Sequence, residues 1–210
     1  MNEELVNILE RVKCLYQKYG IKSITMDDVS RELGISKKTL YQYVTDKTDL
    51  VAKVLELDMN QRKCEFEGLQ NDNKNAIEEL IDVHRFVFKK FMGYNPSTEY
   101  DLRKYYPDLY RKTAEEKHHK MYNKVLENIK RGKAQGLYRQ DLNEEIITKV
   151  TVMRSEISGS IESFTNSELF SPEFFTEIMI YHIRGIANEK GIKFLEDNQH
   201  KFVNTLKELK

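Results

Sequence analysis

Hydrophobic residues recur every three or four positions along most of the chain, the spacing that places them on one face of an α-helix. The first stripe ends at Gly20 and consists of Leu5, Ile8, Leu9, Val12, Leu15, Tyr16 and Tyr19. Later stripes fall within residues 46–69, 76–91, 108–134, 144–164 and 171–187. No segment shows the alternation typical of a half-buried strand. The pattern therefore predicts an all-α protein.

Two short helical segments, joined by a turn that contains glycine, follow the first stripe. Thr25 occupies the N-cap position of the first segment, and Gly34 is placed to end it in a left-handed conformation. Ser36 then caps a second helix that runs to Val44, with Leu40 and Val44 facing inward. Two short helices with such a turn predict a helix-turn-helix.

The outer face of the second segment carries groups that bind nucleic acid. The residues on or beside this face are Lys37, Lys38, Thr39, Tyr41, Gln42 and Tyr43. In a helix-turn-helix the second helix enters the DNA major groove. Lysine can donate to guanine or phosphate, glutamine can pair with adenine, and hydroxyl groups suit phosphate oxygens. The alternative is that the two tyrosines only pack against the first helix and that the lysines are solvated.

Composition and charge narrow the class of protein. Lys+Arg and Asp+Glu both number 34, so no net charge attracts the chain to nucleic acid or membrane. The first 60 residues hold nine Lys/Arg against ten Asp/Glu, so we expect modest non-specific DNA affinity. There is no apolar run near 18 residues and no secretion signal, and the two cysteines, Cys14 and Cys64, lie far apart. We expect a cytoplasmic protein without a metal, a cofactor or a membrane partner.

The stretch "ILERVKCLYQKYGIKSITMDDVSRELGISKKTLYQYVTDKTDLV" resembles the N-terminal domain of TetR-family transcriptional regulators. The marks that carry the resemblance are "YQKYG", "TMDDVSRELGIS" and "TLYQYVTDKTDL", which occur in the family's order. The resemblance departs at two positions: Lys38 stands where glycine is frequent, and Val44 where an aromatic residue is usual.

This resemblance implies a homodimeric repressor that leaves double-stranded operator DNA when a small-molecule effector binds. A three-helix head, residues 1–47 with the motif at about 25–44, would bind DNA. A larger helical domain, residues 48–210, would bind the effector and dimerise. A symmetric dimer predicts a palindromic operator. The residues assigned to DNA by position or by chemistry are Thr25, Ser36, Lys37, Lys38, Thr39, Tyr41, Gln42, Tyr43 and Lys47.

The C-terminal part is rich in aromatic residues that suit an effector pocket. The candidate lining residues are His84, Phe88, Phe91, Tyr105, Tyr110, Tyr122 and Met153. Tyrosine joins an apolar ring to a polar hydroxyl, which fits a ligand pocket and a half-exposed packing surface equally well. A histidine on an apolar stripe, such as His84, is more often a hydrogen-bonded core residue than a ligand contact.

Two late helical segments have more apolar surface than one buried face requires, together with small residues that allow close approach. This surplus predicts an isologous dimer interface, and the resemblance implies a four-helix bundle there. The candidate interface residues are Met153, Ile157, Ile161, Phe175, Ile178 and His182.

Signatures of catalysis are missing from the sequence. It contains no GxSxG, P-loop, GxGxxG, HExxH or CxxC motif. The adjacent His118 and His119 point about 100° apart on a helix, which does not suit a shared metal ion. We therefore expect a protein that is not an enzyme. The alternative to the regulator is a helical interaction module without a small-molecule effector.

Overall fold

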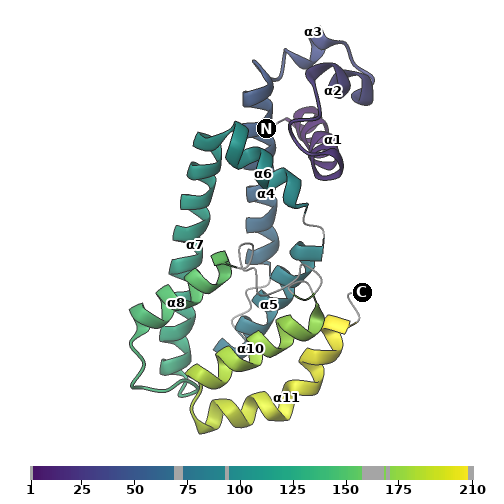
Figure 1. Cartoon of the computed structure of the whole chain (residues 1–210). Coiled ribbons are helices and arrows are strands. Elements are labelled where there is room, and N and C mark those ends of the chain that lie inside the picture. The colour runs from purple at the N-terminus through teal and green to yellow at the C-terminus, as the bar shows by residue number, and fades with distance from the viewer. Residues whose placement is uncertain (1, 69–72, 93–94, 158–167, 169–170, 208–210) are drawn as a thin grey trace. The chain divides into compact units, whose positions relative to one another are not determined.

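The computed structural model describes residues 2–68, 73–92, 95–157, 168 and 171–207, and within them it confirms the predicted all-α class (Figure 1). The helices are α1 (Glu3–Tyr19), α2 (Met26–Leu33), α3 (Lys37–Leu40), α4 (Lys47–Glu67), α5 (Ala76–Met92), α6 (Pro96–Tyr105), α7 (Pro107–Ala134), α8 (Glu144–Ile157), α10 (Pro172–Ile186) and α11 (Glu189–Lys207). No strand occurs among these residues, where Tyr138 and Ala187 form an isolated β-bridge.

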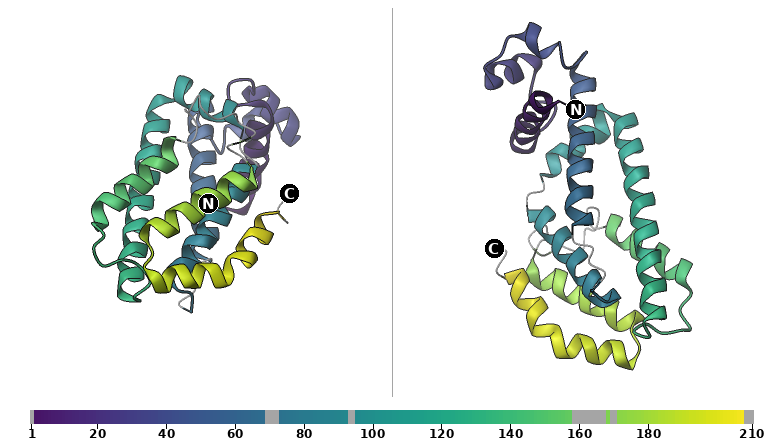
Figure 2. Two further views of the ribbon diagram at one scale, coloured as in Figure 1. Left: turned by 60° about the horizontal axis from the view of Figure 1, so that its bottom comes forward. Right: turned by 180° about the vertical axis from the view of Figure 1, so that it is seen from behind.

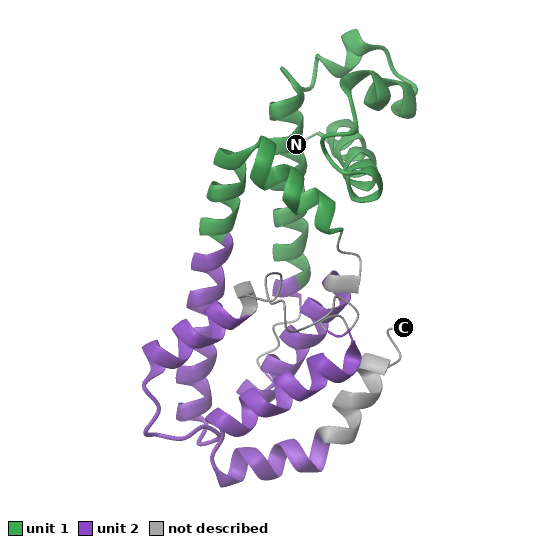
Figure 3. Cartoon of the chain, in the orientation of Figure 1, with its two compact units in different colours: residues 1–65, 94–116 green, residues 66–93, 117–210 purple. Residues whose placement is uncertain are grey.

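The chain packs as two compact units (Figure 3). Unit 1 comprises residues 1–65 and 94–116, and unit 2 comprises residues 66–93 and 117–210. Unit 1 therefore contains the predicted DNA-binding domain together with most of α4, all of α6 and the start of α7.

The core of unit 1 is built from the predicted apolar stripes of the first helices. Its buried members include Leu9 and Val12 of α1, Val29 of α2, Leu40 of α3 and Leu50 of α4. The prediction was wrong for the last residue of the first stripe: Tyr19 is 51% exposed. Because α1 ends there, the Tyr19 ring lies beside solvent, with Lys18 Nζ 5.0 Å from its centroid.

The core of unit 2 is centred on α5 and α10, with α11 beside α10 (Figure 2). Ile77 and Ile81 of α5 belong to one buried cluster with Ile183 and Ile186 of α10. Leu195 of α11 is fully buried in the same cluster. The central position predicted for the helix that begins at residue 76 is thereby confirmed.

Glycine has a different role at the end of α7 than the sequence suggested. Gly132 was expected to loosen the helix, but it lies inside α7 and is buried. A Cβ at this position would lie 2.1 Å from Cδ2 of Tyr138, so the missing side chain makes room for the aromatic ring. The Tyr138 hydroxyl donates to Oδ1 of Asn128 at 3.0 Å. Only Gly136, with φ of 66°, follows the helix as a left-handed residue.

Helix α8 has an apolar face that nothing covers in the described subunit. Ile146, Val150 and Met153 are 57%, 49% and 54% exposed. Their i, i+4, i+7 spacing places them on one stripe, which we call the α8 stripe. The prediction of a single inward stripe on this helix was therefore wrong, because Val152 and the hydroxyl-bearing Thr148 and Thr151 occupy the buried side instead.

Candidate nucleic-acid interface

The first helix of the predicted helix-turn-helix is capped at both ends. Thr25 Oγ1 accepts from the backbone N–H of Asp28 at 3.1 Å, and Asp28 Oδ2 accepts from the N–H of Thr25 at 3.0 Å. Hydrogen bonds from the Thr25 side chain and backbone hold the pKa of Asp28 below its ordinary value. Gly34 ends the helix with φ of 70°. This reciprocal capping box and the left-handed glycine confirm the predicted helix ends.

The second helix begins as predicted but ends earlier. Ser36 Oγ accepts from the N–H of Thr39 at 3.0 Å, which confirms Ser36 as the N-cap. The α-helix covers only Lys37–Leu40 instead of continuing to Val44. The N–H groups of Gln42 and Tyr43 bond to carbonyls three residues earlier, which tightens this stretch into a turn.

The predicted DNA-contacting residues divide by exposure. Exposed side chains are those of Thr25, Ser36, Lys37, Lys38, Tyr41 and Gln42, and partly buried ones are those of Thr39, Tyr43 and Lys47. Ser36 Oγ and Thr39 Oγ1 are hydrogen-bonded at 2.8 Å. The two inward residues, Leu40 and Val44, are 0% and 2% exposed, as predicted. The turn and helix therefore present a polar, partly cationic surface to solvent.

The two adjacent lysines of this surface differ in their partners. Lys37 forms an ion pair with Asp27 of α2. No carboxylate in the described part of the chain forms an ion pair with Lys38. Lys38 is thus the cation that is available to a phosphate or a base without first losing a protein partner.

The two tyrosines of the surface also differ. Tyr41 is 47% exposed, whereas Tyr43 packs against the unit 1 core. A hydrogen bond with Glu4, followed by burial, raises the pKa of Tyr43. The Tyr43 carbonyl accepts from Lys53 Nζ at 2.7 Å. Tyr43 therefore ties the turn to α1 and α4.

Lys47, at the start of α4, is held close to the loop before α2. Its Nζ donates to the carbonyl of Lys22 at 3.2 Å. Burial lowers the pKa of Lys47, while the carboxylates of Asp101 and Asp28 act in the opposite direction.

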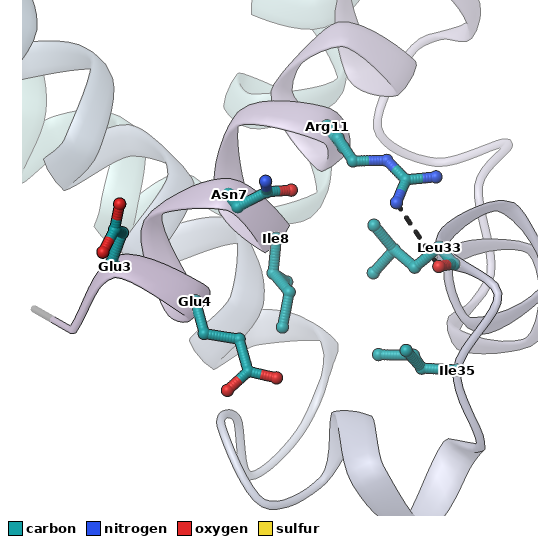
Figure 4. A pocket seen from close by; sticks show the side chains of 7 residues that line it. All are labelled: Glu3, Glu4, Asn7, Ile8, Arg11, Leu33 and Ile35. Carbon is teal, nitrogen blue, oxygen red and sulfur yellow. Dashed lines mark hydrogen bonds between the residues drawn. The ribbon is translucent and has the colours of Figure 1, made fainter.

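Helix α1 supports the motif through a residue that sequence reasoning missed. The guanidinium of Arg11 donates to the carbonyls of Glu32 and Leu33, at the C-terminal end of α2 (Figure 4). The last carbonyls of a helix have no intrahelical partner, so this contact fixes α2 against α1. An arginine on the polar side of an amphipathic helix gives no sign of such a role in the sequence.

Helix α6 holds the end of α1 and the loop before α2, an arrangement that we call the α6 clasp. Its contacts are Asn95 Nδ2 to the Gln17 carbonyl at 2.7 Å, Thr98 Oγ1 to the Tyr16 carbonyl at 3.1 Å, the Lys22 N–H to Asp101 Oδ2 at 2.8 Å, and Lys22 Nζ to the Tyr105 hydroxyl at 2.7 Å. Gly20, with φ of 79°, allows the close approach, since a Cβ there would lie 3.0 Å from Asp101 Oδ2. The partners lie about 80 residues apart, beyond the reach of local patterns.

The residues predicted to line an effector pocket belong to both units. Tyr105 and Tyr110 lie in unit 1, where Tyr105 takes part in the α6 clasp and Tyr110 packs against the unit 1 core. In unit 2, Phe88 is fully buried, His84 and Tyr122 are partly buried and Met153 belongs to the exposed α8 stripe. The side chain of Phe91 lies outside the described residues.

The residues predicted for the dimer interface also have different environments. Phe175 and Ile178 are partly buried, and His182 is 9% exposed within the single chain. Ile161 and the side chain of Ile157 lie outside the described residues. Met153 is exposed.

Comparisons with known proteins agree with this architecture. Residues 8–54 match the family model for bacterial regulatory proteins of the tetR family. An HTH-type transcriptional regulator of Staphylococcus aureus (strain bovine RF122 / ET3-1) is 34% identical over 64 residues, which cover 30% of this chain and 35% of that protein. The chain therefore spans about a third of the length of the curated relatives that it matches.

Solved structures extend the similarity to the whole fold. A transcriptional regulator from Cytophaga hutchinsonii ATCC 33406 superposes with a TM-score of 0.73 at 18% identity, covering 89% of this chain and 100% of that one. A TetR-family regulator from Streptomyces coelicolor gives a TM-score of 0.68 at 16% identity, covering 86% and 88%. At these identities the similarity concerns the fold.

The capped motif and the helical body define a helix-turn-helix protein with an all-α C-terminal region. More particularly, residues 8–54 form a TetR-family N-terminal domain, and the family predicted from the sequence is confirmed. No helix in the described ranges is long and apolar enough to cross a membrane.

Proposed function

We propose that this protein is a DNA-binding transcriptional regulator, a repressor that a small-molecule effector releases from a palindromic operator. The observation that carries the proposal is the capped helix-turn-helix of a TetR-family domain, whose exposed surface includes Lys38, Tyr41 and Gln42. TetR-family regulators are DNA-binding transcriptional regulators. In this proposal residues 1–47 bind DNA, residues 48–210 bind the effector and dimerise, and the protein acts in the cytoplasm without catalysing a reaction.

A homodimer is part of the proposal because one head covers only half of a palindrome. The α8 stripe supports it, since three large apolar side chains at helical spacing are exposed in the single subunit. Such a contiguous apolar face is typical of a protein interface. Self-association through α8 and α10 would cover the stripe and place two heads about one two-fold axis.

Release by an effector follows from thermodynamic linkage. A ligand that binds better to the form with misplaced heads weakens DNA binding. DNA must then weaken ligand binding by the same factor, typically about 5–150-fold. We expect an effector, once found, to show this difference in titrations with and without operator. Equal affinities in the two titrations would exclude induction while leaving DNA binding intact.

The experiment that tests the proposal is binding of the purified protein to DNA from upstream of its own gene. We expect saturable binding that weakens as salt rises, with a footprint over an imperfect palindrome. A scrambled duplex of the same length and composition is the control. Failure to bind any upstream segment at low salt would refute the regulator and support the interaction module.

A further inference from the structure

Three nitrogen-bearing side chains in unit 2 have unused hydrogen-bonding capacity: Arg154 of α8, His84 of α5 and His182 of α10. Within the described ranges no carboxylate pairs with Arg154, and its guanidinium has no hydrogen-bond partner. His182 is 9% exposed, yet neither ring nitrogen bonds to any described residue. His84 uses only Nδ1, which lies 3.1 Å from the Leu80 carbonyl. Buried polar groups are normally paired, so an unpaired set requires an explanation.

These three groups are near one another. Burial, followed by the positive charge of Arg154 and then His84, lowers the pKa of His182 to about 3. Burial also lowers the pKa of His84 to about 4, and Arg154 contributes in the same direction. Burial lowers the pKa of Arg154 as well. At neutral pH the cluster therefore consists of one partly buried cation beside two neutral imidazoles, which can each donate one N–H.

The carboxylates of the neighbouring helices are engaged elsewhere. On α5, Glu79 bonds to Arg131 and Asn128, and Asp82 bonds to Lys74 and Arg85; on α8, Glu144 pairs with Lys133 at 3.0 Å. Their charges are thus compensated away from Arg154. An isolated charge in a partly desolvated position is costly unless an opposite charge meets it. The missing partner of Arg154 is therefore an anion.

An apolar layer lies next to the polar cluster. Phe88 follows His84 by one helical turn, and Phe175 precedes His182 by about two turns on α10. The two phenyl rings meet edge to face with centroids 5.0 Å apart. Phe88 is fully buried and Phe175 partly buried. A polar group set beside aromatic rings is the usual composition of a site for a small organic molecule.

We propose that Arg154, His84 and His182 bind the carboxylate of an organic acid whose apolar part packs against Phe88 and Phe175. The guanidinium forms two parallel hydrogen bonds with a carboxylate, and the imidazole N–H groups complete its coordination. The role of this acid as effector rests on the proposed function, whereas its binding does not.

Calorimetric titration of the full chain with benzoate and octanoate tests the site. Benzamide is the neutral control, and inorganic phosphate tests for a general anion site. We expect one of the two carboxylates to bind and benzamide to bind at least about tenfold more weakly. Arg154→Gln should weaken carboxylate binding by at least about tenfold. Lys193→Gln, which removes a charge from an exposed position of α11, should leave it unchanged.

Two results would overturn the proposal. The first is equal behaviour of the wild type and Arg154→Gln toward both acids, including the absence of binding in both proteins. The second is binding of phosphate in place of the acids, which would reject a carboxylate site. Operator binding by the unliganded protein is measured separately, so failure of the acid site and failure of the regulator proposal are distinguishable.

A measurement without ligand separates a binding role from a structural one. If Arg154 awaits an external anion, Arg154→Leu removes an uncompensated charge and should raise the melting temperature of the unliganded protein. A cation that stabilises the subunit would instead give a lower melting temperature in this variant. That result would overturn the proposal even if Arg154→Gln also bound the acids weakly.

Discussion

The carboxylate of Asp101 on α6 accepts a hydrogen bond from the backbone N–H of Lys22, 79 residues earlier in the chain, at 2.8 Å. This bond is the central contact of the α6 clasp, and it makes the loop before the helix-turn-helix depend on a helix outside the predicted DNA-binding domain.

Removal of the Asp101 acceptor should destabilise unit 1. Asp101 is 9% exposed, so Asp101→Leu leaves the Lys22 N–H without a partner and should cost about 1–3 kcal/mol of unfolding free energy. Asp101→Asn keeps an acceptor oxygen and should cost less. Urea unfolding measures both variants, with exposed Asp108→Asn as the control. Equal effects of Leu and Asn at position 101 would show that the hydrogen bond contributes little.

Lys38 and Tyr41 should contribute to operator affinity without contributing to folding. Lys38→Ala removes a cation that has no ion-pair partner in the described part of the chain and should lower the slope of log K against log salt by about one. Tyr41→Phe removes one exposed hydroxyl and should weaken binding with little change in slope. Fluorescence anisotropy across a salt series, with Lys193→Ala as control, measures both. Wild-type affinity in the two variants would place the DNA contacts elsewhere.

A charge on the α8 stripe should separate the subunits. Val150 is 49% exposed, so Val150→Asp should change the stability of an isolated subunit by no more than about 0.5 kcal/mol. In a dimer that buries the stripe, the new carboxylate loses its water and opposes association. Sedimentation should then show monomers that no longer bind the palindrome. Lys193→Asp is the control, and a soluble Val150→Asp dimer would move the interface away from α8.

The two buried histidines should make the protein less stable in mild acid. Their pKa values of about 4 for His84 and about 3 for His182 lie below the ordinary 6.5. Below pH 6.5 the unfolded chain takes up protons that the folded chain does not, so the unfolding free energy falls as pH decreases toward 4. The expected slope is about 1.4 kcal/mol per pH unit for each histidine. Replacement of both by Gln should flatten the curve between pH 6.5 and 4, and parallel curves would contradict the assignment.

Two helical glycines should respond to alanine with opposite signs. Gly132→Ala forces a methyl group into the ring of Tyr138 and should cost about 1–3 kcal/mol or more. Nothing lies within 4 Å of a Cβ at Gly185 on α10, so Gly185→Ala should stabilise by about 0.4–1 kcal/mol. Thermal unfolding of the two variants compares them directly. A neutral Gly132→Ala would mean that Tyr138 has another place to go.

The sequence predicted those parts of the molecule that short-range chemistry determines. The caps at Thr25, Gly34 and Ser36 involve groups within a few residues of one another, and the inward positions of Leu40 and Val44 follow from helical spacing. The same spacing was misleading on α8, because an apolar stripe has the same pattern whether it faces a core or an exposed surface.

The support of the candidate site was beyond prediction for a physical reason. Arg11 contacts the end of α2, and Asp101 contacts Lys22, through chain reversals that no local pattern records. The unpaired state of Arg154 could not be foreseen either. A sequence shows a charge but not whether the folded chain brings an opposite charge to it.

The ion pair between Lys37 and Asp27 has a consequence for how quickly an operator is found. Counterion release counts only the cations that meet phosphates, so a lysine already neutralised adds little to binding of random DNA. The residence time on non-operator sequences should therefore be short, and sliding should cover few base pairs per encounter. The protein would then search the chromosome mainly by repeated dissociation and three-dimensional diffusion, with long residence only at sites where base contacts replace the Asp27 carboxylate.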